Sequence, residues 1–225
     1  MSAAPTAVFD LDGTLIDTAP DLLEAVNAVL ESEKVGHVHR DDLNHLVGHG
    51  GRAMIKAAYA KFEREADEQT LDRLIPVFIE AYSQSMPGQS KPYEGVIDLV
   101  NELRAQEWRC AVCTNKMIGL AKPLLKALEI NELFDHVAGG DSYPFKKPDP
   151  RHIEQTIIDA GGLPGKAVMF GDSENDILAA KSGNIPVIAV DFGYTPKHVS
   201  TFGPERVISS YLDLAVQDID QLLRT

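Results

Sequence analysis

Two carboxylates one residue apart, Asp10 and Asp12, give the clearest indication of chemistry in this sequence. They follow the apolar run 7–9, which is typical of a short buried strand, and they precede a Gly-Thr pair where that strand would turn. Side chains at positions i and i+2 of an extended backbone point the same way. At a separation of about 4 Å and an effective dielectric of about 20, two like charges repel by roughly 4 kcal/mol. A hard divalent cation such as Mg2+ removes this repulsion by binding carboxylate oxygens, so the pair predicts a metal site.

Three later segments carry polar side chains that suit a phosphoryl group. They supply a hydroxyl, an amide with nearby backbone N–H groups, an ammonium and two further carboxylates. In chain order these residues are Thr114, Asn115, Lys147, Asp172 and Asp176. Each has an ordinary alternative interpretation, as turn chemistry, an exposed loop or a helix cap. If the strands before them are parallel, however, they meet Asp10 at one edge of the sheet, and together they predict a phosphoryl-binding metal site.

The elements that must position these residues follow from the spacing of apolar side chains. Helical spacing without any strand pattern predicts helices over residues 19–34, 41–47, 51–62 and 67–85. After residue 92 strands and helices alternate, which is typical of a parallel sheet with helices on both faces. The predicted strands there are 109–114, 135–138, 166–171, 186–190 and 206–208, and the predicted helices are 94–106, 118–129, 150–160, 174–182 and 211–223.

This alternation predicts an α/β fold with a parallel, Rossmann-like sheet that includes the first strand. The core domain would be discontinuous, formed by residues 1–17 and 91–225. Residues 18–90 would form an all-helical cap domain inserted after the first strand. Open parallel sheets hold their ligands at the carboxyl edge of the strands, so the inserted helices are expected to cover the site.

Composition limits the classes of partner. A net charge of -13 without clustered Lys and Arg argues against nucleic-acid binding. No apolar run approaches the roughly 18 residues of a membrane span, and no signal peptide is recognisable at the N-terminus, so neither membrane insertion nor export is expected. Cys110 and Cys113 would face opposite sides of one strand, which favours two buried thiols over a redox pair or a zinc site. That usage suits the cytoplasm.

Taken in order, the motifs resemble those of the haloacid dehalogenase superfamily of aspartate-nucleophile phosphatases. The matching residues are Asp10-Leu11-Asp12-Gly13-Thr14 for its first motif, Thr114 for the second, Lys147 for the third and Asp172 with Asp176 for the fourth. The resemblance spans nearly the whole chain. It implies a Mg2+-dependent phosphomonoester hydrolase with an aspartyl-phosphate intermediate.

The resemblance also implies a role for each catalytic residue. Asp10 would attack phosphorus as an ionised carboxylate that needs no base to activate it. Asp12 would protonate the leaving alcohol and then take a proton from the attacking water. Lys147 would offset the negative charge that Asp10 shares with the phosphate.

The remaining residues of the motifs would bind metal and phosphate. By the same resemblance, Mg2+ would be held by Asp10, the backbone carbonyl of Asp12 and Asp172, with Asp176 in support. The Thr114 hydroxyl and the Asn115 N–H would bind phosphoryl oxygens.

A helical insertion after the first motif resembles the subfamily of phosphoglycolate phosphatases and β-phosphoglucomutases. The segment 47–52 is similar to the glycine-rich cap loop of the former, where Arg52 or His49 would meet a substrate carboxylate. The alternative is a turn between two helices with exposed polar groups.

The predicted activity is hydrolysis of 2-phosphoglycolate to glycolate and phosphate. A sugar-phosphate phosphatase, nucleotidase, pyrophosphatase or phosphomutase of the same fold is the alternative, and a catalytically silent regulatory binding protein is the alternative of a different class. The expected partner is a small phosphorylated metabolite, and the expected state is a monomer or a homodimer.

Overall fold

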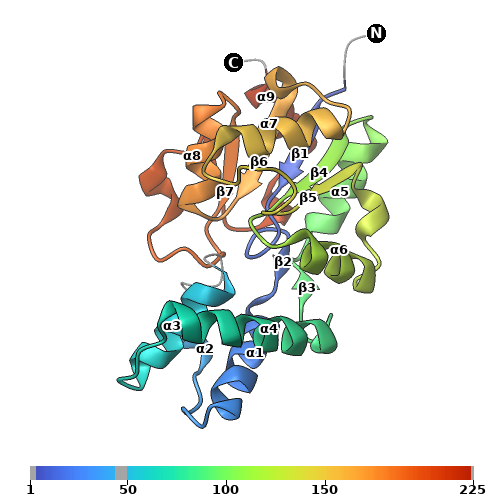
Figure 1. Ribbon diagram of the computed structural model, residues 1–225. Coiled ribbons are helices and arrows are strands. Elements are labelled where there is room, and N and C mark those ends of the chain that lie inside the picture. Colours follow the sequence, from blue (N-terminus) through green and yellow to red (C-terminus); the bar gives the residue numbers. More distant parts are fainter. Residues whose placement is uncertain (1–3, 44–49, 224–225) are drawn as a thin grey trace.

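The computed structural model describes residues 4–43 and 50–223 of the chain. A parallel sheet with helices on both faces forms one part, and a group of helices forms the other (Figure 1). The six strands follow the order β5-β4-β1-β6-β7-β8 across the sheet. Their bounds are Thr6–Phe9 for β1, Arg109–Cys113 for β4, His136–Ala138 for β5, Ala167–Gly171 for β6, Val187–Val190 for β7 and Arg206–Ile208 for β8. The α/β fold and the parallel sheet predicted from the sequence are confirmed.

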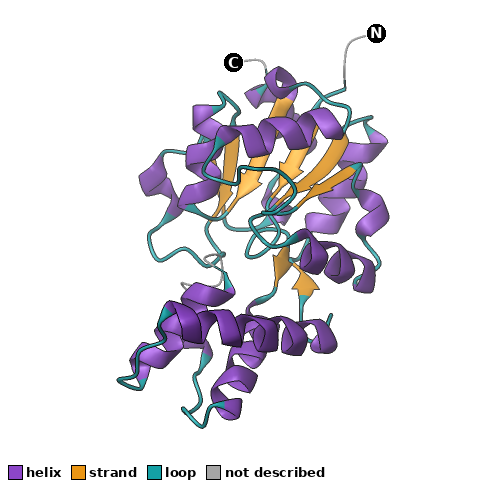
Figure 2. Cartoon of the chain, viewed as in Figure 1, coloured by secondary structure: helices purple, strands orange, loops and turns teal. Residues whose placement is uncertain are grey.

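The central strand β1 is buried along its whole length, because it has a parallel neighbour at each edge and helices cover both faces of the sheet. Its side chains alternate between two apolar clusters, with Phe9 in one and Val8 in the other. The Phe9 cluster contains side chains of α5 (Val96–Ala105), α6 (Ile118–Ala127) and α9 (Val216–Leu222). The Val8 cluster contains side chains of α7 (Pro150–Asp159) and α8 (Glu174–Ser182). Figure 2 shows the resulting three layers, with the sheet between helices.

The helices inserted after β1 have an apolar core of their own, formed mainly by α1, α3 and α4. The bounds are Ala19–Ser32 for α1, Arg40–Leu43 for α2, Gly51–Lys61 for α3 and Glu68–Ser85 for α4. These helices lie beyond the carboxyl ends of the core strands, and the described termini lie at the opposite end of the molecule (Figure 1). The domain boundaries at residues 18 and 90 stay a prediction.

A two-stranded antiparallel ribbon joins the two parts. It pairs β2 (Ile16–Asp17) with β3 (Lys91–Pro92), and the sequence did not predict it. Asp21, buried in the first turn of α1, ties the returning chain to the outgoing one. Its carboxylate accepts hydrogen bonds from the backbone N–H groups of Gln89 and Ser90, at 2.8 and 2.9 Å. The two chain segments that connect the core with the helical part are therefore held together by hydrogen bonds.

The predicted helix over residues 211–223 is wrong in its first half. A 3-10 turn at Tyr211–Asp213 comes first, and α9 begins only at Val216. Tyr211 and Leu214 are both buried against the sheet, which requires an extended step between turn and helix. The Ser210 hydroxyl caps the turn by accepting a hydrogen bond from the Leu212 N–H. Further 3-10 turns span Asn131–Leu133, Pro164–Lys166 and Val199–Phe202.

Other predicted elements agree with the structure within a few residues at each end. The predicted helix 41–47 is described only as far as Leu43, and its remainder lies outside the described residues. Cys110 and Cys113 are free, buried and in opposite apolar clusters, which confirms that they face different sides of the sheet. Within residues 4–43 and 50–223, no helix is long and apolar enough to cross a membrane.

Candidate active site

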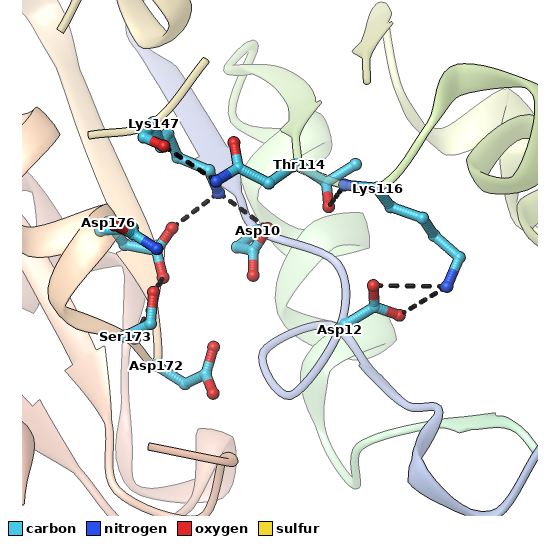
Figure 3. Close-up of a pocket in the computed structure, with 10 residues that line it drawn as sticks. Asp10, Asp12, Thr114, Lys116, Lys147, Asp172, Ser173 and Asp176 are labelled. Carbon is cyan, nitrogen blue, oxygen red and sulfur yellow. Dashed lines mark hydrogen bonds and ion pairs between the residues drawn. The ribbon is translucent and has the colours of Figure 1, made fainter. Parts of the chain in front are cut away.

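The carboxyl ends of the central strands bring the predicted site residues to one pocket. Asp10 follows β1, Thr114 follows β4 and Asp172 follows β6, as expected for parallel neighbours. The same pocket is lined by Lys147 and Asp176 (Figure 3). Residues from four separate segments of the chain thus converge on one small volume.

Lys147 is the positive centre of this pocket. Its ammonium lies 2.7 Å from Asp10 Oδ1, 2.6 Å from Asp176 Oδ1 and 2.6 Å from the Cys113 carbonyl oxygen. Only 2% of its side-chain surface is exposed. Burial opposes the charged form, but the two carboxylates outweigh it and raise the pKa of Lys147 above its ordinary value. The ammonium is therefore permanently charged between Asp10 and Asp176, as Figure 3 shows.

Two contacts fix the backbone that presents this lysine. The Lys147 N–H donates to Nδ1 of His152 in the first turn of α7, at 3.2 Å. The Asn115 side-chain amide donates to the Lys147 carbonyl, at 2.9 Å. Asp149 then caps α7 by accepting a hydrogen bond from the Arg151 N–H. Lys147 is thus held from both the β4 loop and α7.

Asp10, Asp172 and Asp176 form a buried carboxylate cluster. One oxygen of each lies within 4.8 Å of the others. Burial raises the pKa of Asp10 to about 7, against the lowering effect of Lys147. Burial and the charges of Asp176 and Asp10 raise the pKa of Asp172 as well. Carboxylates gathered this closely in a buried site are the donor set that a hard divalent cation prefers.

Neighbouring groups hold the cluster in place. Asp172 accepts hydrogen bonds from the Tyr194 N–H at 2.8 Å and from the Thr14 hydroxyl at 3.1 Å. Asp176 accepts from the N–H and the hydroxyl of Ser173, at 3.0 and 2.6 Å, at the start of α8. Each carboxylate keeps an oxygen that faces the cluster.

Asp12 lies outside the carboxylate cluster. Its carboxylate is paired with the ammonium of Lys116, at 3.0 and 3.3 Å, and accepts a hydrogen bond from the Thr18 hydroxyl at 2.7 Å. Figure 3 shows it turned toward Lys116, on the side of the pocket away from Asp176. The Asp12 carboxylate is therefore not among the three clustered carboxylates, and the expectation that the side chains of Asp10 and Asp12 share a cation stays a prediction. The resemblance had assigned the Asp12 backbone carbonyl to the metal, and that assignment stays a prediction.

Thr114 and Asn115 lie where β4 ends. The Thr114 hydroxyl is buried and accepts a hydrogen bond from the Lys116 N–H at 3.1 Å. This hydrogen bond closes residues 114–116 into a tight turn. Oδ1 of Asn115 is buried and has no hydrogen-bond partner among the described residues. Both residues line the pocket, so polar groups remain there to receive a ligand.

A second, larger cavity of about 550 Å3 adjoins the pocket and lies between the helical part and the core. It shares Asp12, Asn115, Lys116 and Lys147 with the pocket. Apolar side chains of α1, α4 and α6 line much of the rest, among them Leu22, Phe78 and Leu120. The pocket thus opens toward the helices.

Of the two cap residues suggested from the sequence as carboxylate ligands, the structure describes only one. Arg52, at the start of α3, lines the cavity, but its guanidinium is paired with Glu68 at 2.9 Å and with Asp72. Both ion pairs are largely exposed, which limits their strength. His49 lies outside the described residues.

Sequence reasoning missed three residues around the site. Lys116 is the first of them, and its place directly after Thr114 and Asn115 is the sequence signal that could have identified it as a ligand group. Tyr82 of α4 lies under the Lys116 ammonium, 4.4 Å from ring centroid to Nζ. Tyr194 connects Asp172 to strand β2, since its N–H donates to Asp172 and its hydroxyl donates to Asp17 at 2.7 Å. No local sequence signal identifies either tyrosine.

Comparisons with known proteins agree with this geometry. Residues 7–190 match the family model described as haloacid dehalogenase-like hydrolase. A phosphoglycolate phosphatase of Mesorhizobium japonicum is 45% identical over 220 residues, covering 98% of this chain and 97% of that protein. One from Agrobacterium fabrum is 44% identical, covering 98% and 94%. A crystal structure described as a predicted phosphoglycolate phosphatase from Haemophilus somnus superposes with a TM-score of 0.88 at 28% identity, covering 98% of this chain and all of that one.

Proposed function

This chain belongs to the haloacid dehalogenase-like hydrolases, and we propose that it is a Mg2+-dependent phosphatase that converts 2-phosphoglycolate to glycolate and phosphate. It is a phosphoric monoester hydrolase by its family and its relatives. The observation that carries the proposed chemistry is the buried cluster of Asp10, Asp172 and Asp176 around the Lys147 ammonium. The proposed substrate is that of the relatives from Mesorhizobium japonicum and Agrobacterium fabrum.

We propose that Mg2+ is held by Asp10 and Asp172, with the Asp12 backbone carbonyl as a further ligand and Asp176 in support. The donor set fits, because the described carboxylate oxygens lie within 4.8 Å of one another and are buried. Bound there, Mg2+ supplies Lewis-acid charge that neutralises the phosphoryl oxygens.

Asp10 is the proposed nucleophile. Its carboxylate oxygen forms a bond to phosphorus while the bond from phosphorus to the glycolate oxygen breaks, which leaves a phosphoryl group on Asp10. Lys147 favours the ionised form of Asp10, since its ammonium lies 2.7 Å from Oδ1. Water then attacks the same phosphorus and releases Asp10.

Asp12 is the proposed acid and base. It gives a proton to the departing glycolate oxygen and takes one back from the attacking water. The Thr114 hydroxyl and the Asn115 N–H are proposed to bind phosphoryl oxygens, and Lys147 offsets the charge that accumulates there.

The test is phosphate release from 2-phosphoglycolate, sugar phosphates, nucleotides and pyrophosphate, with Mg2+ or with EDTA, for the wild type and for Asp10→Asn. We expect Mg2+-dependent release that is highest for 2-phosphoglycolate and absent in the variant. Equal activity in the variant would exclude Asp10 as nucleophile. A higher kcat/KM for another compound would keep the chemistry and replace the substrate.

We further propose that the partner is a small phosphorylated metabolite, that the chain acts as a monomer or homodimer, and that it works in a reducing compartment such as the cytoplasm. The two free, buried thiols support the last point. Size-exclusion chromatography with light scattering measures the oligomeric state.

A further inference from the structure

Lys116 is a core lysine in an unusual setting. Its ammonium lies between the Asp12 carboxylate and the ring face of Tyr82, which belongs to the inserted helix α4. Only 5% of its side-chain surface is exposed. It lines both the catalytic pocket and the larger cavity beside it. A cation in this position faces whatever part of a substrate extends from the phosphoryl group toward the helices.

The other cations around the cavity are less suited to that part of a substrate. Lys147 is bound by Asp10 and Asp176 in the catalytic cluster. Arg52 is paired with two acidic residues of the helical part. Lys146 is exposed at the rim, where solvent screens its charge.

We propose that Lys116 binds a carboxylate at the far end of the substrate, and that this carboxylate takes the place of Asp12 in the Lys116 ion pair. This inference rests on the proposed function, in which Asp12 transfers protons. It makes Lys116 the residue that selects short phosphomonoesters with a second anionic group.

The position of Lys116 in the loop limits the length of such a substrate. Its own N–H donates to the Thr114 hydroxyl, so the proposed phosphoryl-binding group and the ammonium belong to one tight turn. The ammonium is also within 3.3 Å of both oxygens of Asp12, only two residues from the proposed nucleophile. This arrangement favours a substrate whose phosphoryl and carboxylate groups are separated by few atoms, as they are in a two-carbon phosphoacid.

Exchange of one carboxylate for another explains why such a substrate would also react faster. A buried ammonium that loses its partner is costly, so Lys116 releases Asp12 only when another anion replaces it. A substrate with a neutral tail offers no such anion and leaves Asp12 bound to Lys116. Discrimination is then expected in kcat as well as in KM.

The experiment compares 2-phosphoglycolate with 2-hydroxyethyl phosphate, which has the same length but a neutral end. The wild type is assayed with Mg2+ beside Lys116→Met, Lys146→Met and Arg52→Met. We expect Lys116→Met to lower kcat/KM for 2-phosphoglycolate by about tenfold or more, the usual effect of losing a charged hydrogen bond. For 2-hydroxyethyl phosphate we expect kcat to rise, because Lys116 no longer holds Asp12. The other two variants should keep the wild-type preference.

An equal loss with both substrates in Lys116→Met would overturn the proposal, since it would mean that Lys116 only positions Asp12. Loss of preference in Lys146→Met or Arg52→Met instead would also overturn it. If Lys116→Met does not fold, Lys116→Gln is used, with the midpoint of urea unfolding as the check.

Equilibrium binding separates recognition from turnover. In the Asp10→Asn background, calorimetry with Mg2+ should show that Lys116→Met weakens 2-phosphoglycolate binding and leaves 2-hydroxyethyl phosphate binding unchanged. Unchanged affinity for both compounds would contradict the proposal. A wild type that hydrolyses both esters equally well would refute this inference and keep the phosphatase activity, whereas a wild type that hydrolyses no monoester would refute the proposed function itself.

Discussion

Protonation of His152 is expected to destabilise the fold. The side chain is fully buried in the first turn of α7, and its Nδ1 accepts the hydrogen bond from the Lys147 N–H. Its Nε2 is buried and has no hydrogen-bond partner among the described residues. Burial and the nearby Lys147 charge lower the pKa of His152 to about 4. The neutral ring is therefore the form that the folded protein holds.

The size of the effect follows from the difference between the folded and unfolded pKa values. An unfolded histidine titrates near 6.5, so the unfolded chain takes up a proton at a higher pH than the folded one. Stability from His152 is present above pH 6.5 and is lost as the pH falls toward 4. At pH 5 the unfolded residue is almost fully protonated and the folded one about one-tenth protonated, which costs about 2 kcal/mol. The cost approaches about 3 kcal/mol at pH 4 and below.

Urea unfolding of the wild type and of His152→Gln, in EDTA at pH 7.5, 6 and 5, measures this contribution. Other groups titrate in the same range. The raised pKa of Asp10, for example, gives stability that is lost as the pH rises through about 7. Subtracting the unfolding free energy of the variant from that of the wild type cancels the contributions of these other groups. We expect this difference in unfolding free energy, wild type minus variant, to fall by about 2 kcal/mol between pH 7.5 and pH 5.

A difference that stays constant over this pH range would refute the reasoning. Thr156→Val is the matched control, because it alters a buried polar residue of the same helix without removing a titrating group. Its difference from the wild type should not change with pH.

Four further results are expected. Asp12→Asn should lower the single-turnover rate of alcohol release from an alkyl phosphate by about 10^2-fold or more and the rate of p-nitrophenol release from p-nitrophenyl phosphate much less, since the latter's leaving group needs no proton; equal losses in this first step would argue against Asp12 as the acid. Mg2+ binding measured by calorimetry should tighten about tenfold from pH 6 to pH 8, because Asp10, with its pKa of about 7, must first lose a proton, and pH-independent binding would contradict this. Lys147→Met should destabilise the metal-free protein by about 3–5 kcal/mol at pH 8 in urea unfolding, since it leaves buried carboxylates unpaired, and unchanged stability would count against the pairing. Tyr194→Phe should cost about 1–3 kcal/mol in the same assay, because the N–H groups of Thr18 and Ala19 lose their acceptor, and a neutral effect would show that water replaces the hydroxyl.

The carboxyl-edge residues could be placed from the sequence because short apolar runs before them are unambiguous. Once β1, β4 and β6 are parallel, their ends must meet, and the positions of Asp10, Thr114 and Asp172 follow. No comparable rule connects Asp12 with Lys116, or Lys116 with Tyr82. The contact between Lys116 and Tyr82 depends on how α4 packs over the core, and the contact between Asp12 and Lys116 depends on the side-chain conformations in two core loops. Residue spacing within one segment predicts neither contact.

Short elements are the second part of the structure that the sequence does not predict. The ribbon of β2 and β3 has two residues in each strand, too few for any alternation of apolar and polar side chains. The break before α9 is equally local. Tyr211 and Leu214 are spaced as on a helix face, but Tyr211–Asp213 forms a 3-10 turn and the chain is extended at Leu214 and Ala215 before α9 begins.

The central place of β1 has a consequence for the order in which the molecule is made. Thr6 lies opposite both Arg109 and Ala167, so the first strand to be synthesised acquires its neighbours late. Helices α1 to α4 contact one another and are expected to pack while β1 still has two open edges. The carboxylate cluster forms only when β6 docks with Asp172 and Asp176 behind it. Throughout that interval an apolar strand is exposed on the nascent chain, and this is the stage at which we expect the protein to depend most on chaperones.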